Sequence, residues 1–469
     1  MGTSSGPSAT QPSLLIPARI VARQSVFLFL FLGVFCDALV VHVAPMVGIT
    51  DEHFRHLMAL INPEAVLWSE MVKPKYLLQA DETKARALLS GGGPQNRVLQ
   101  LGGNNAEDLG AAVRLARRHG WNSFDLNLGC PSIETNAPFG ASLIRDPQLV
   151  LRLVESMAEA AQGPVSIKTR IGVYEAPPQD YSQDSYQRLL DFLHLVTATG
   201  AVGSVVIHAR AAVLSGMSCE ANREAPPLRY DFVYQAATDL KARGVLVTLN
   251  GGVGDVSLSS LQALEAETAL SGVMVGRLVV RDPMALASVS ASASASASAS
   301  ASASASASAR AAISGLLQHK LNAIAQYERY AQRQLAREWG SRPLDVVAPL
   351  ILLFLSSCPG PGPSPGTGPG SGPEDANGQV AVGRASASAL LAAIQSIEQS
   401  KGRGRGKEGL KLAGLLREVN SCREHEELQA VAGAVRRAAK DFAGGKGVFS
   451  KLVRVGASRS SSSRSHDSL

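Results

Sequence analysis

The stretch that decides the fold runs from residue 124 to residue 131 and reads Phe-Asp-Leu-Asn-Leu-Gly-Cys-Pro. Its first half predicts a short buried strand, and its glycine and proline predict a tight turn directly afterwards. Cys130 therefore lies at the carboxyl end of a strand, where parallel barrel enzymes carry their reactive groups. The alternative is a buried structural cysteine in a strand-to-loop corner, and the other strand ends decide between the two.

The same pattern, a short apolar run followed by an amphipathic stretch, recurs along the chain. Strands are predicted at residues 40–46, 65–69, 97–101, 122–127, 164–170, 203–209, 245–250 and 271–275. Helices are predicted at residues 50–61, 105–119, 147–162, 185–199, 229–242 and 257–266. Eight strand–helix units indicate an α/β protein with a parallel (β/α)₈ barrel. A doubly wound sheet also alternates, but it usually has a GxGxxG turn after its first strand, which this chain lacks.

The segments around the barrel differ from it in composition and divide the 469-residue chain into parts. We expect a targeting or disordered segment at 1–37, the barrel at 38–286, an Ala/Ser linker at 287–310, a small helical domain at 311–445 and a disordered tail at 446–469. A Pro/Gly-rich insert at 358–385 interrupts the helical domain. Both low-complexity stretches are interpreted as spacers, because neither composition can bury a core.

Composition limits the compartment and the partners. Residues 1–36 contain no Asp or Glu but include Arg19 and Arg23, which fits a transit peptide. The expected location is the cytoplasm, or a chloroplast or mitochondrion if that segment is a transit peptide. The apolar run at 26–36 is too short to span a membrane, so no stable membrane association is expected. Five cysteines without CxxC spacing indicate neither a disulfide framework nor a metal site. Separately, the chain is expected to be a monomer.

Other predicted strand ends carry residues that suit one site at the barrel mouth. Residues 250–252 (Asn-Gly-Gly) and Arg277 follow the last two strands, where glycine N–H groups and a helix start favour a phosphate. Lys168, His208 and Gln100 end three earlier strands. A cation and an amide can stabilise negative charge on an isoalloxazine ring. Each feature alone is more often structural, but together they favour FMN over a dinucleotide held by a Rossmann turn.

The chain resembles the tRNA-dihydrouridine synthases, in particular the bacterial-type subfamily that acts at tRNA position 20/20a. The matching motifs are VAPM (43–46), LQLGG (99–103), LNLGCPS (126–132), FGA (139–141), KTRIG (168–172), IHAR (207–210), NGG (250–252) and GVMVGR (272–277). Within the loop at 214–228, NRE at 222–224 and PPL at 226–228 carry the resemblance to the subfamily. The resemblance is strong over residues 41–285 and weak after residue 311.

This resemblance implies an oxidoreductase that uses FMN, with NADPH or NADH as reductant, to convert a uridine of the tRNA D-loop to 5,6-dihydrouridine. Hydride would pass from FMN to C6 of the uracil, and Cys130 would give a proton to C5. Asn127 would help to position the base, Arg223 would contact the tRNA, and the helical domain would bind tRNA. The residues implied to hold FMN are Pro45, Met46, Val47, Gln100, Lys168, His208, Asn250, Gly251, Gly252, Gly276 and Arg277. No metal is implied.

Two other functions stay open at this point. One is an FMN barrel oxidoreductase that acts on a free pyrimidine, although such an enzyme has no need of the loop that carries Arg223. The other is a tRNA-binding or folding factor with weakened catalysis. The segment from Cys130 to Phe139 is one residue shorter than the resemblance predicts, which is the only feature that favours this second alternative.

Overall fold

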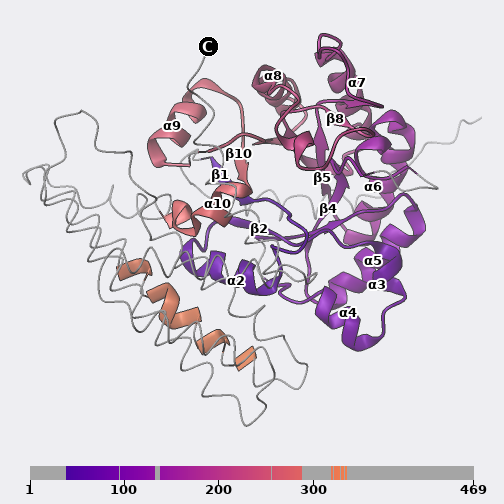
Figure 1. Cartoon of the computed structure of the whole chain (residues 1–469). Coiled ribbons are helices and arrows are strands. Elements are labelled where there is room, and N and C mark those ends of the chain that lie inside the picture. Colours follow the sequence, from indigo (N-terminus) through magenta and orange to yellow (C-terminus); the bar gives the residue numbers. More distant parts are fainter. Residues whose placement is uncertain are drawn as a thin grey trace, which may run out of the picture. The chain divides into compact units, whose positions relative to one another are not determined.

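A computed structural model describes residues 39–93, 96–132, 138–254, 256–287 and 318–334, the last range without residues 321, 328 and 332. These residues contain a closed barrel of parallel strands (Figure 1). Its strands are β1 (Val40–Val43), β2 (Val66–Trp68), β3 (Arg97–Leu101), β4 (Ser123–Leu128), β5 (Val165–Arg170), β7 (Val202–His208), β9 (Leu246–Asn250) and β10 (Gly272–Val275). All eight predicted strands are therefore confirmed.

The barrel closes between its first and last strands. Val40 to Val43 of β1 pair with Gly272 to Val275 of β10, and the other edge of β1 pairs with β2. The remaining strands follow one another around the barrel in chain order. Because every pairing is parallel, the carboxyl ends of all the strands meet at one rim. The fold thus brings together the strand-end residues that the sequence singled out.

The six predicted helices are also confirmed and lie outside the strands (Figure 1). They are α2 (Glu52–Ile61), α5 (Ala106–Arg118), α6 (Pro147–Ala161), α7 (Tyr186–Val196), α8 (Tyr230–Lys241) and α9 (Leu258–Glu267). Their starts follow from capping, since the Asp51 carboxylate accepts a hydrogen bond from Phe54 N at 2.8 Å. Asp146 caps α6 in the same way, with Pro147 in its first turn.

Short elements were not predicted from the sequence. The β2–β3 connection contains α3 (Pro74–Leu78) and α4 (Glu82–Leu88), and the chain after β10 forms α10 (Arg277–Arg281) and the 3₁₀ turn η3 (Pro283–Leu286). Two further 3₁₀ turns are η1 (Gly140–Arg145) and η2 (Ala221–Arg223). β6 (Val173–Tyr174) pairs with β8 (Ala212–Val213) in a separate sheet. Strands of two residues carry no periodicity signal, but this pair ties the chain after β5 to the chain after β7.

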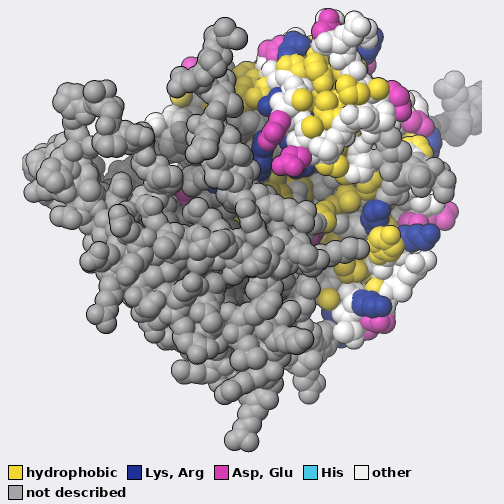
Figure 2. All heavy atoms as spheres, viewed as in Figure 1, with side chains coloured by type: hydrophobic (Ala, Val, Ile, Leu, Met, Phe, Trp, Pro, Cys, Tyr) yellow, Lys and Arg dark blue, Asp and Glu magenta, His cyan; other side chains and the backbone are white. Residues whose placement is uncertain are grey.

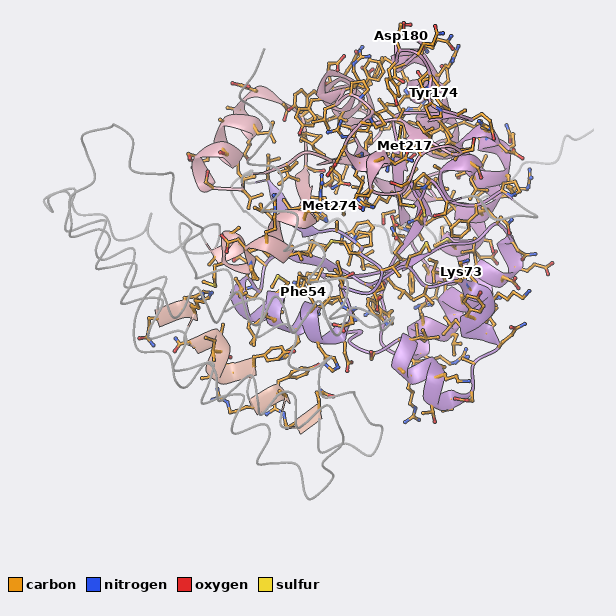
Figure 3. All side chains as sticks on the ribbon, viewed as in Figure 1. Phe54, Lys73, Tyr174, Asp180, Met217 and Met274 are labelled. Carbon is orange, nitrogen blue, oxygen red and sulfur yellow. The ribbon has the colours of Figure 1, made fainter. Side chains whose placement is uncertain are left out.

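Two separate apolar clusters give the barrel its core. Phe54 of α2 belongs to the larger cluster, which joins helices to strands, whereas Met274 of β10 belongs to a small one with Val98 and Val206 (Figure 3). Successive strand residues face opposite sides, so Val98 and Met274 point inward together with every second residue of their strands. Towards the carboxyl rim the inward positions become polar, which leaves the rim half of the barrel for chemistry.

The described residues between 318 and 334 are helical. Tyr330 hydrogen-bonds His53 Nδ1 at 2.8 Å and stacks on His56 with ring centroids 3.8 Å apart. This helix falls within the predicted helical domain, whose bounds stay predictions. The segment at 1–37, the Pro/Gly insert at 358–385 and the tail at 446–469 lie outside the described residues. Among the helices that are described, none combines the length and the apolar character needed to cross a membrane.

Candidate active site

Lys168, Asn250 and His208 lie together on neighbouring strands at the rim. Lys168 Nζ donates a hydrogen bond to Asn250 Oδ1 at 2.9 Å, and Asn250 Nδ2 donates to the Met274 carbonyl at 2.8 Å. In the β7–β9 register, His208 is the partner of Asn250. Burial first, and then repulsion from Arg170, lower the pKa of Lys168 to about 8. The amine therefore still carries its proton at neutral pH and presents a cation at the rim.

His208 has a buried ring nitrogen without a hydrogen-bond partner among the described residues. The residue is 9% exposed, and this nitrogen is its Nδ1 atom. Burial lowers its pKa well below the usual range, and the nearby cations Arg170 and Lys168 act in the same direction. The ring is therefore neutral. A buried, neutral imidazole with an open nitrogen fits contact with a bound ligand.

The turn after β9 passes directly over this histidine. Gly251 has φ +98°, and a Cβ atom there would lie 3.0 Å from the His208 ring. Gly252 has φ +71°, and a Cβ atom there would lie 2.7 Å from the Tyr230 hydroxyl. Both the positive φ values and the lack of space require glycine. The backbone can therefore approach the site closely, as a cradle for a phosphate or a ring must.

A directional chain of hydrogen bonds builds the turn that carries Cys130. Asn127 Oδ1 accepts from the N–H groups of Gly129 at 3.2 Å and Cys130 at 3.0 Å. This fixes the orientation of the Asn127 amide, so its Nδ2 donates to Gln100 Oε1 at 2.9 Å. Gln100 Nε2 in turn donates to Asp125 Oδ2 at 2.8 Å. Asn127 and Gln100 thus share one network that holds the cysteine turn.

Asp125 is the last residue in this series of hydrogen bonds, and it was not predicted as a site residue. It is fully buried, and its Oδ1 lies 2.9 Å from Ser166 Oγ. Desolvation raises its pKa well above the usual range, although its hydrogen-bond contacts with Gln100 and Ser166 oppose the shift. The signal was present in the sequence, because a carboxyl two residues before Asn127 on one strand must face the same side.

Cys130 is half-buried, and the chain beyond it is packed closely against it. The Cys130 carbonyl accepts a hydrogen bond from Ala141 N at 2.8 Å. Gly140 has φ +57°, and a Cβ atom there would lie 2.4 Å from that carbonyl oxygen. A hydrogen bond with Cys219, together with burial, raises the pKa of Cys130 above its usual value. The thiol therefore holds its proton at neutral pH.

Arg170 joins the cysteine turn to the loop that carries Arg223. Its Nε donates to the Gly129 carbonyl at 3.2 Å, and its Nη1 donates to the carbonyls of Ala211 at 3.1 Å and Asn222 at 2.8 Å. Arg223 itself is exposed beside Asn222. The loop with the predicted tRNA contact therefore lies against the predicted catalytic turn.

Comparison with known proteins agrees with this geometry. The model of the protein family described as "Dihydrouridine synthase (Dus)" matches residues 42–338 of the chain. The chain belongs to the dihydrouridine synthase family. It is 39% identical over 248 residues to a tRNA-dihydrouridine(20/20a) synthase of Vibrio parahaemolyticus, covering 53% of this chain and 71% of that protein. Synthases of the same description from Pseudomonas syringae and Escherichia coli are 40% and 37% identical, with 69% and 67% of their lengths covered.

Solved structures similar to this family member are more distant. A 2-naphthoyl-CoA reductase complex aligns with TM-score 0.38 and 10% identity, over 54% of this chain and 50% of that one. Morphinone reductase in complex with tetrahydroNAD aligns with TM-score 0.34 and 13% identity, over 51% and 83%. These values are too low to add to what the strand pairing already establishes.

The remaining residues that the family resemblance pointed to lie at the ends of β1 and β10. Met46 accepts hydrogen bonds from the N–H groups of Ile49 and Thr50, and Val47 is 52% exposed. Gly276 lies beside them, since a Cβ atom there would be 3.4 Å from Met46 Sδ. Pro45 precedes this turn. The strand ends on both sides of the barrel closure thus meet.

Arg277 has a partner that the sequence did not reveal. Its Nη1 forms an ion pair with Glu224 at 2.5 Å, and both side chains are largely exposed. The predicted extra charge for a phosphate is thus shared with a carboxylate from the loop of Arg223. Across the described surface in Figure 2, positive and negative side chains likewise lie next to one another.

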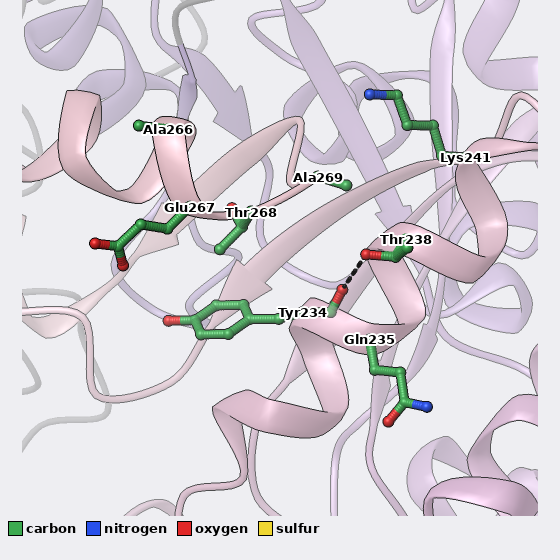
Figure 4. A pocket seen from close by; sticks show the side chains of 8 residues that line it. All are labelled: Tyr234, Gln235, Thr238, Lys241, Ala266, Glu267, Thr268 and Ala269. Atoms are coloured by element: carbon green, nitrogen blue, oxygen red, sulfur yellow. Dashed lines mark hydrogen bonds between the residues drawn. The ribbon is translucent and has the colours of Figure 1, made fainter.

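Two other features of the described residues lie outside the candidate site or do not contribute to it. A hollow between α8 and the α9–β10 connection is lined by Tyr234, Thr238, Lys241 and Glu267 and is built from helices outside the barrel (Figure 4). It contains none of the predicted site residues. Within the described ranges, no group of three or more His, Cys, Asp or Glu side chains is placed to hold a metal ion.

Proposed function

We propose that this family member is an FMN-dependent tRNA-dihydrouridine synthase that reduces a D-loop uridine at position 20/20a with NADPH or NADH. The observation that carries the proposal is the juxtaposition at one rim of a protonated thiol, Cys130, with the cluster of Lys168, His208 and Asn250. The tRNA position 20/20a is supported by relatives described as 20/20a synthases, such as that of Vibrio parahaemolyticus, which is 39% identical over 248 residues.

The residues at the rim fit a flavin phosphate and ring. The open His208 Nδ1 and the left-handed glycines at 251 and 252 suit close ligand contact, and Lys168 offers a cation. The residues proposed to hold FMN are Pro45, Met46, Val47, Gln100, Lys168, His208, Asn250, Gly251, Gly252, Gly276 and Arg277. Bound FMN would supply the hydride for C6 of the uracil.

Cys130 is the proposed proton donor to C5 of the uracil. A general acid must hold its proton at working pH, and burial helps to keep the Cys130 thiol protonated. Asn127 fixes the turn through two backbone N–H groups, which sets the position of the thiol relative to the rim. The Asn127 amide has two hydrogens, and the hydrogen bond to Gln100 uses one of them. The other hydrogen is proposed to contact the base.

The tRNA is proposed to approach over the loop of residues 214–228. Arg223 is exposed there, and Arg210 of the β7 rim lies beside this loop, donating to the Pro226 carbonyl. Reaching the uracil requires the base to leave its stack, and phosphate contacts from arginine stabilise such a complex. The helical domain from residue 311 to residue 445 is proposed to supply the remaining tRNA contacts.

The first experiment tests the acid. A strain that lacks this protein should lose dihydrouridine at its target tRNA position, as mapped by chemical sequencing. The wild-type gene should restore it, and Cys130→Ala should not. Full restoration by Cys130→Ala contradicts the assignment of the acid. Loss of tRNA binding or folding without any change in dihydrouridine would point instead to a binding factor.

The second experiment tests the flavin. The purified protein should contain FMN by absorbance, and Lys168→Met should weaken FMN binding by about tenfold or more, since one charge-assisted contact contributes roughly 1.5–3 kcal/mol. Because Lys168 has a pKa of about 8, binding should also weaken above that pH in the wild type but not in the variant. Lys241→Met, at an exposed position on α8, is the matched control. Reoxidation of the reduced flavin by a free pyrimidine rather than by tRNA contradicts the proposed substrate.

A further inference from the structure

A second thiol lies next to the proposed acid. Cys219 comes from the loop between β8 and η2, and its Sγ lies 3.5 Å from Ser132 Oγ. The same hydroxyl accepts a hydrogen bond from the Cys130 thiol at 3.2 Å. Cys219 is exposed, whereas Cys130 is half-buried. The three side chains therefore form a continuous path from solvent to the proposed proton donor.

Buried contacts fix the loop that presents Cys219. Asn222 is fully buried and exchanges hydrogen bonds with the backbone of Val213, accepting at 2.7 Å and donating at 2.9 Å. Its amide also donates to the Ser218 carbonyl at 3.2 Å. These contacts hold the residues on both sides of Cys219. The thiol pair therefore results from a specified loop conformation.

The charges around this pair explain why a second thiol matters. Arg170 and Arg223 act on Cys219, while Lys168 and Arg170 act on Cys130, and Arg210 lies beside Arg170. A lone thiol among these cations would tend to ionise, which would remove the proton that an acid must carry.

A negative charge on Cys219 offsets those cations. The hydrogen bond with Cys130, helped by Ser132 and by the two arginines, lowers the pKa of Cys219 to about 5. The same contact raises the pKa of Cys130. The pair thus shares one proton at neutral pH. Because Cys130 is half-buried and Cys219 is exposed, desolvation favours the proton on Cys130 and the negative charge on Cys219.

We propose that Cys219 is a positioning residue that keeps Cys130 protonated and, through Ser132, returns a proton to it after each turnover. This rests on the proposed role of Cys130 as the proton donor. When the Cys130 S–H bond breaks and the proton goes to C5 of the uracil, Cys130 is left as a thiolate. Cys219 then takes a proton from a hydronium ion of the solvent, which leaves water, and passes it to Ser132 Oγ, while the Ser132 O–H proton moves to Cys130. The cycle ends with the original charges restored.

Thiol reactivity tests the pair without any tRNA reaction. The full chain is alkylated with iodoacetamide across pH 4–10, and peptide mass spectrometry follows each cysteine. Cys219 should react with a midpoint near pH 5, while Cys130 stays slow at pH 7. Cys219→Ser should speed Cys130 alkylation at pH 7 at least tenfold, and Cys219→Asp, which keeps the charge, should keep it slow. Cys422→Ser controls for the loss of a thiol elsewhere. An unchanged Cys130 rate in Cys219→Ser overturns the proposal.

Dihydrouridine formation tests the proton return. In Cys219→Ser the multiple-turnover rate should fall about tenfold at pH 8 and much less at pH 6, while the first turnover of reduced enzyme at pH 6 changes little. Cys219→Asp should recover most of the rate, and Ser132→Ala should resemble Cys219→Ser. Equal losses at both pH values, or in the first turnover, overturn the relay. If Cys130→Ala keeps full activity, Cys130 is not the acid and the proposed function of that residue is wrong. The alkylation experiment then still measures whether Cys219 controls the protonation of Cys130.

Discussion

The buried Asp125 carboxyl makes the sharpest prediction about how the cysteine turn is stabilised. Its Oδ2 accepts from Gln100 Nε2 at 2.8 Å, and its Oδ1 lies 2.9 Å from Ser166 Oγ, which donates to the Phe124 carbonyl at 3.2 Å. A protonated carboxyl satisfies all these contacts, because its O–H donates to the Ser166 oxygen. An asparagine amide has the same shape, with an oxygen that accepts from Gln100 and an NH2 group that donates to the Ser166 oxygen. Asp125→Asn should therefore preserve the network.

The magnitude separates this variant from a truncation. We expect Asp125→Asn to change the free energy of unfolding by less than about 1 kcal/mol at pH 4, where the wild-type carboxyl is protonated in the fold and about half protonated in the unfolded chain. Asp125→Ala leaves the buried Gln100 N–H without its acceptor and removes packed atoms. It should cost roughly 2–4 kcal/mol, from the unsatisfied donor and the cavity together. Because Gln100 orients Asn127, the alanine variant should also loosen the turn that carries Cys130.

The pH dependence has a definite sign. Burial raises the folded-state pKa of Asp125 above its unfolded value of about 3.9. Its contribution to stability is therefore fully present below about pH 3.9 and is lost as the pH rises towards the folded-state pKa, at up to about 1.4 kcal/mol per pH unit. The Asp125→Asn variant lacks this loss. Its stability relative to wild type should therefore increase with pH over that window.

Urea unfolding followed by tryptophan fluorescence at several pH values between 4 and 8 measures these differences. Trp68 and Trp121 are both buried in the barrel, so their emission reports its unfolding. If Asp125→Asn is as destabilised as Asp125→Ala, the carboxyl is ionised in the fold and the reasoning fails. A difference between Asp125→Asn and wild type that does not change with pH would also refute it.

Two further predictions concern packing. Gly140→Ala forces a side chain to within 2.4 Å of the Cys130 carbonyl at φ +57°, so it should cost about 2–4 kcal/mol in thermal unfolding. Gly163→Ala, where a Cβ atom meets nothing within 4 Å, should cost little, and equal losses in both variants would refute the steric argument. Tyr330→Phe removes the hydrogen bond to His53 and should cost about 0.5–1.5 kcal/mol in the same thermal unfolding measurement, and an unchanged unfolding temperature would refute a stabilising role for this bond.

The sequence allowed the barrel and its rim to be predicted because both follow from local pattern. The last inward residues of a parallel strand lie at the carboxyl rim, and this located Lys168, His208 and Asn250 at the ends of three predicted strands without any tertiary information. The same alternation marks Asp125, which was overlooked because its apolar neighbours suggested a uniformly buried strand. The predicted roles of these side chains in binding and catalysis stay predictions.

Contacts between rim loops could not be predicted in this way. Ser132 and Cys219 are separated by 87 residues, and Arg277 and Glu224 by 53. Each pair meets only because loops from different strands fold over the rim, held by the two-residue strands β6 and β8. Loop conformation of this kind depends on particular tertiary hydrogen bonds, such as those of Asn222, which leave no periodic signal in the sequence.

The register between β4 and β5 couples the two halves of the candidate site. Asp125 pairs with Ser166 and Asn127 pairs with Lys168. The network that orients the cysteine turn and the cation that faces the β9 turn thus share one face of the β4–β5 ladder, where Asn127 is the direct partner of Lys168. A slip of one residue between β4 and β5 would turn the residues of the slipped strand outward and separate the two sets. Changes on this face should therefore disturb Cys130 and Lys168 at once, whereas changes in the loop of Cys219 should act on the thiol pair and leave the proposed flavin contact of Lys168 intact.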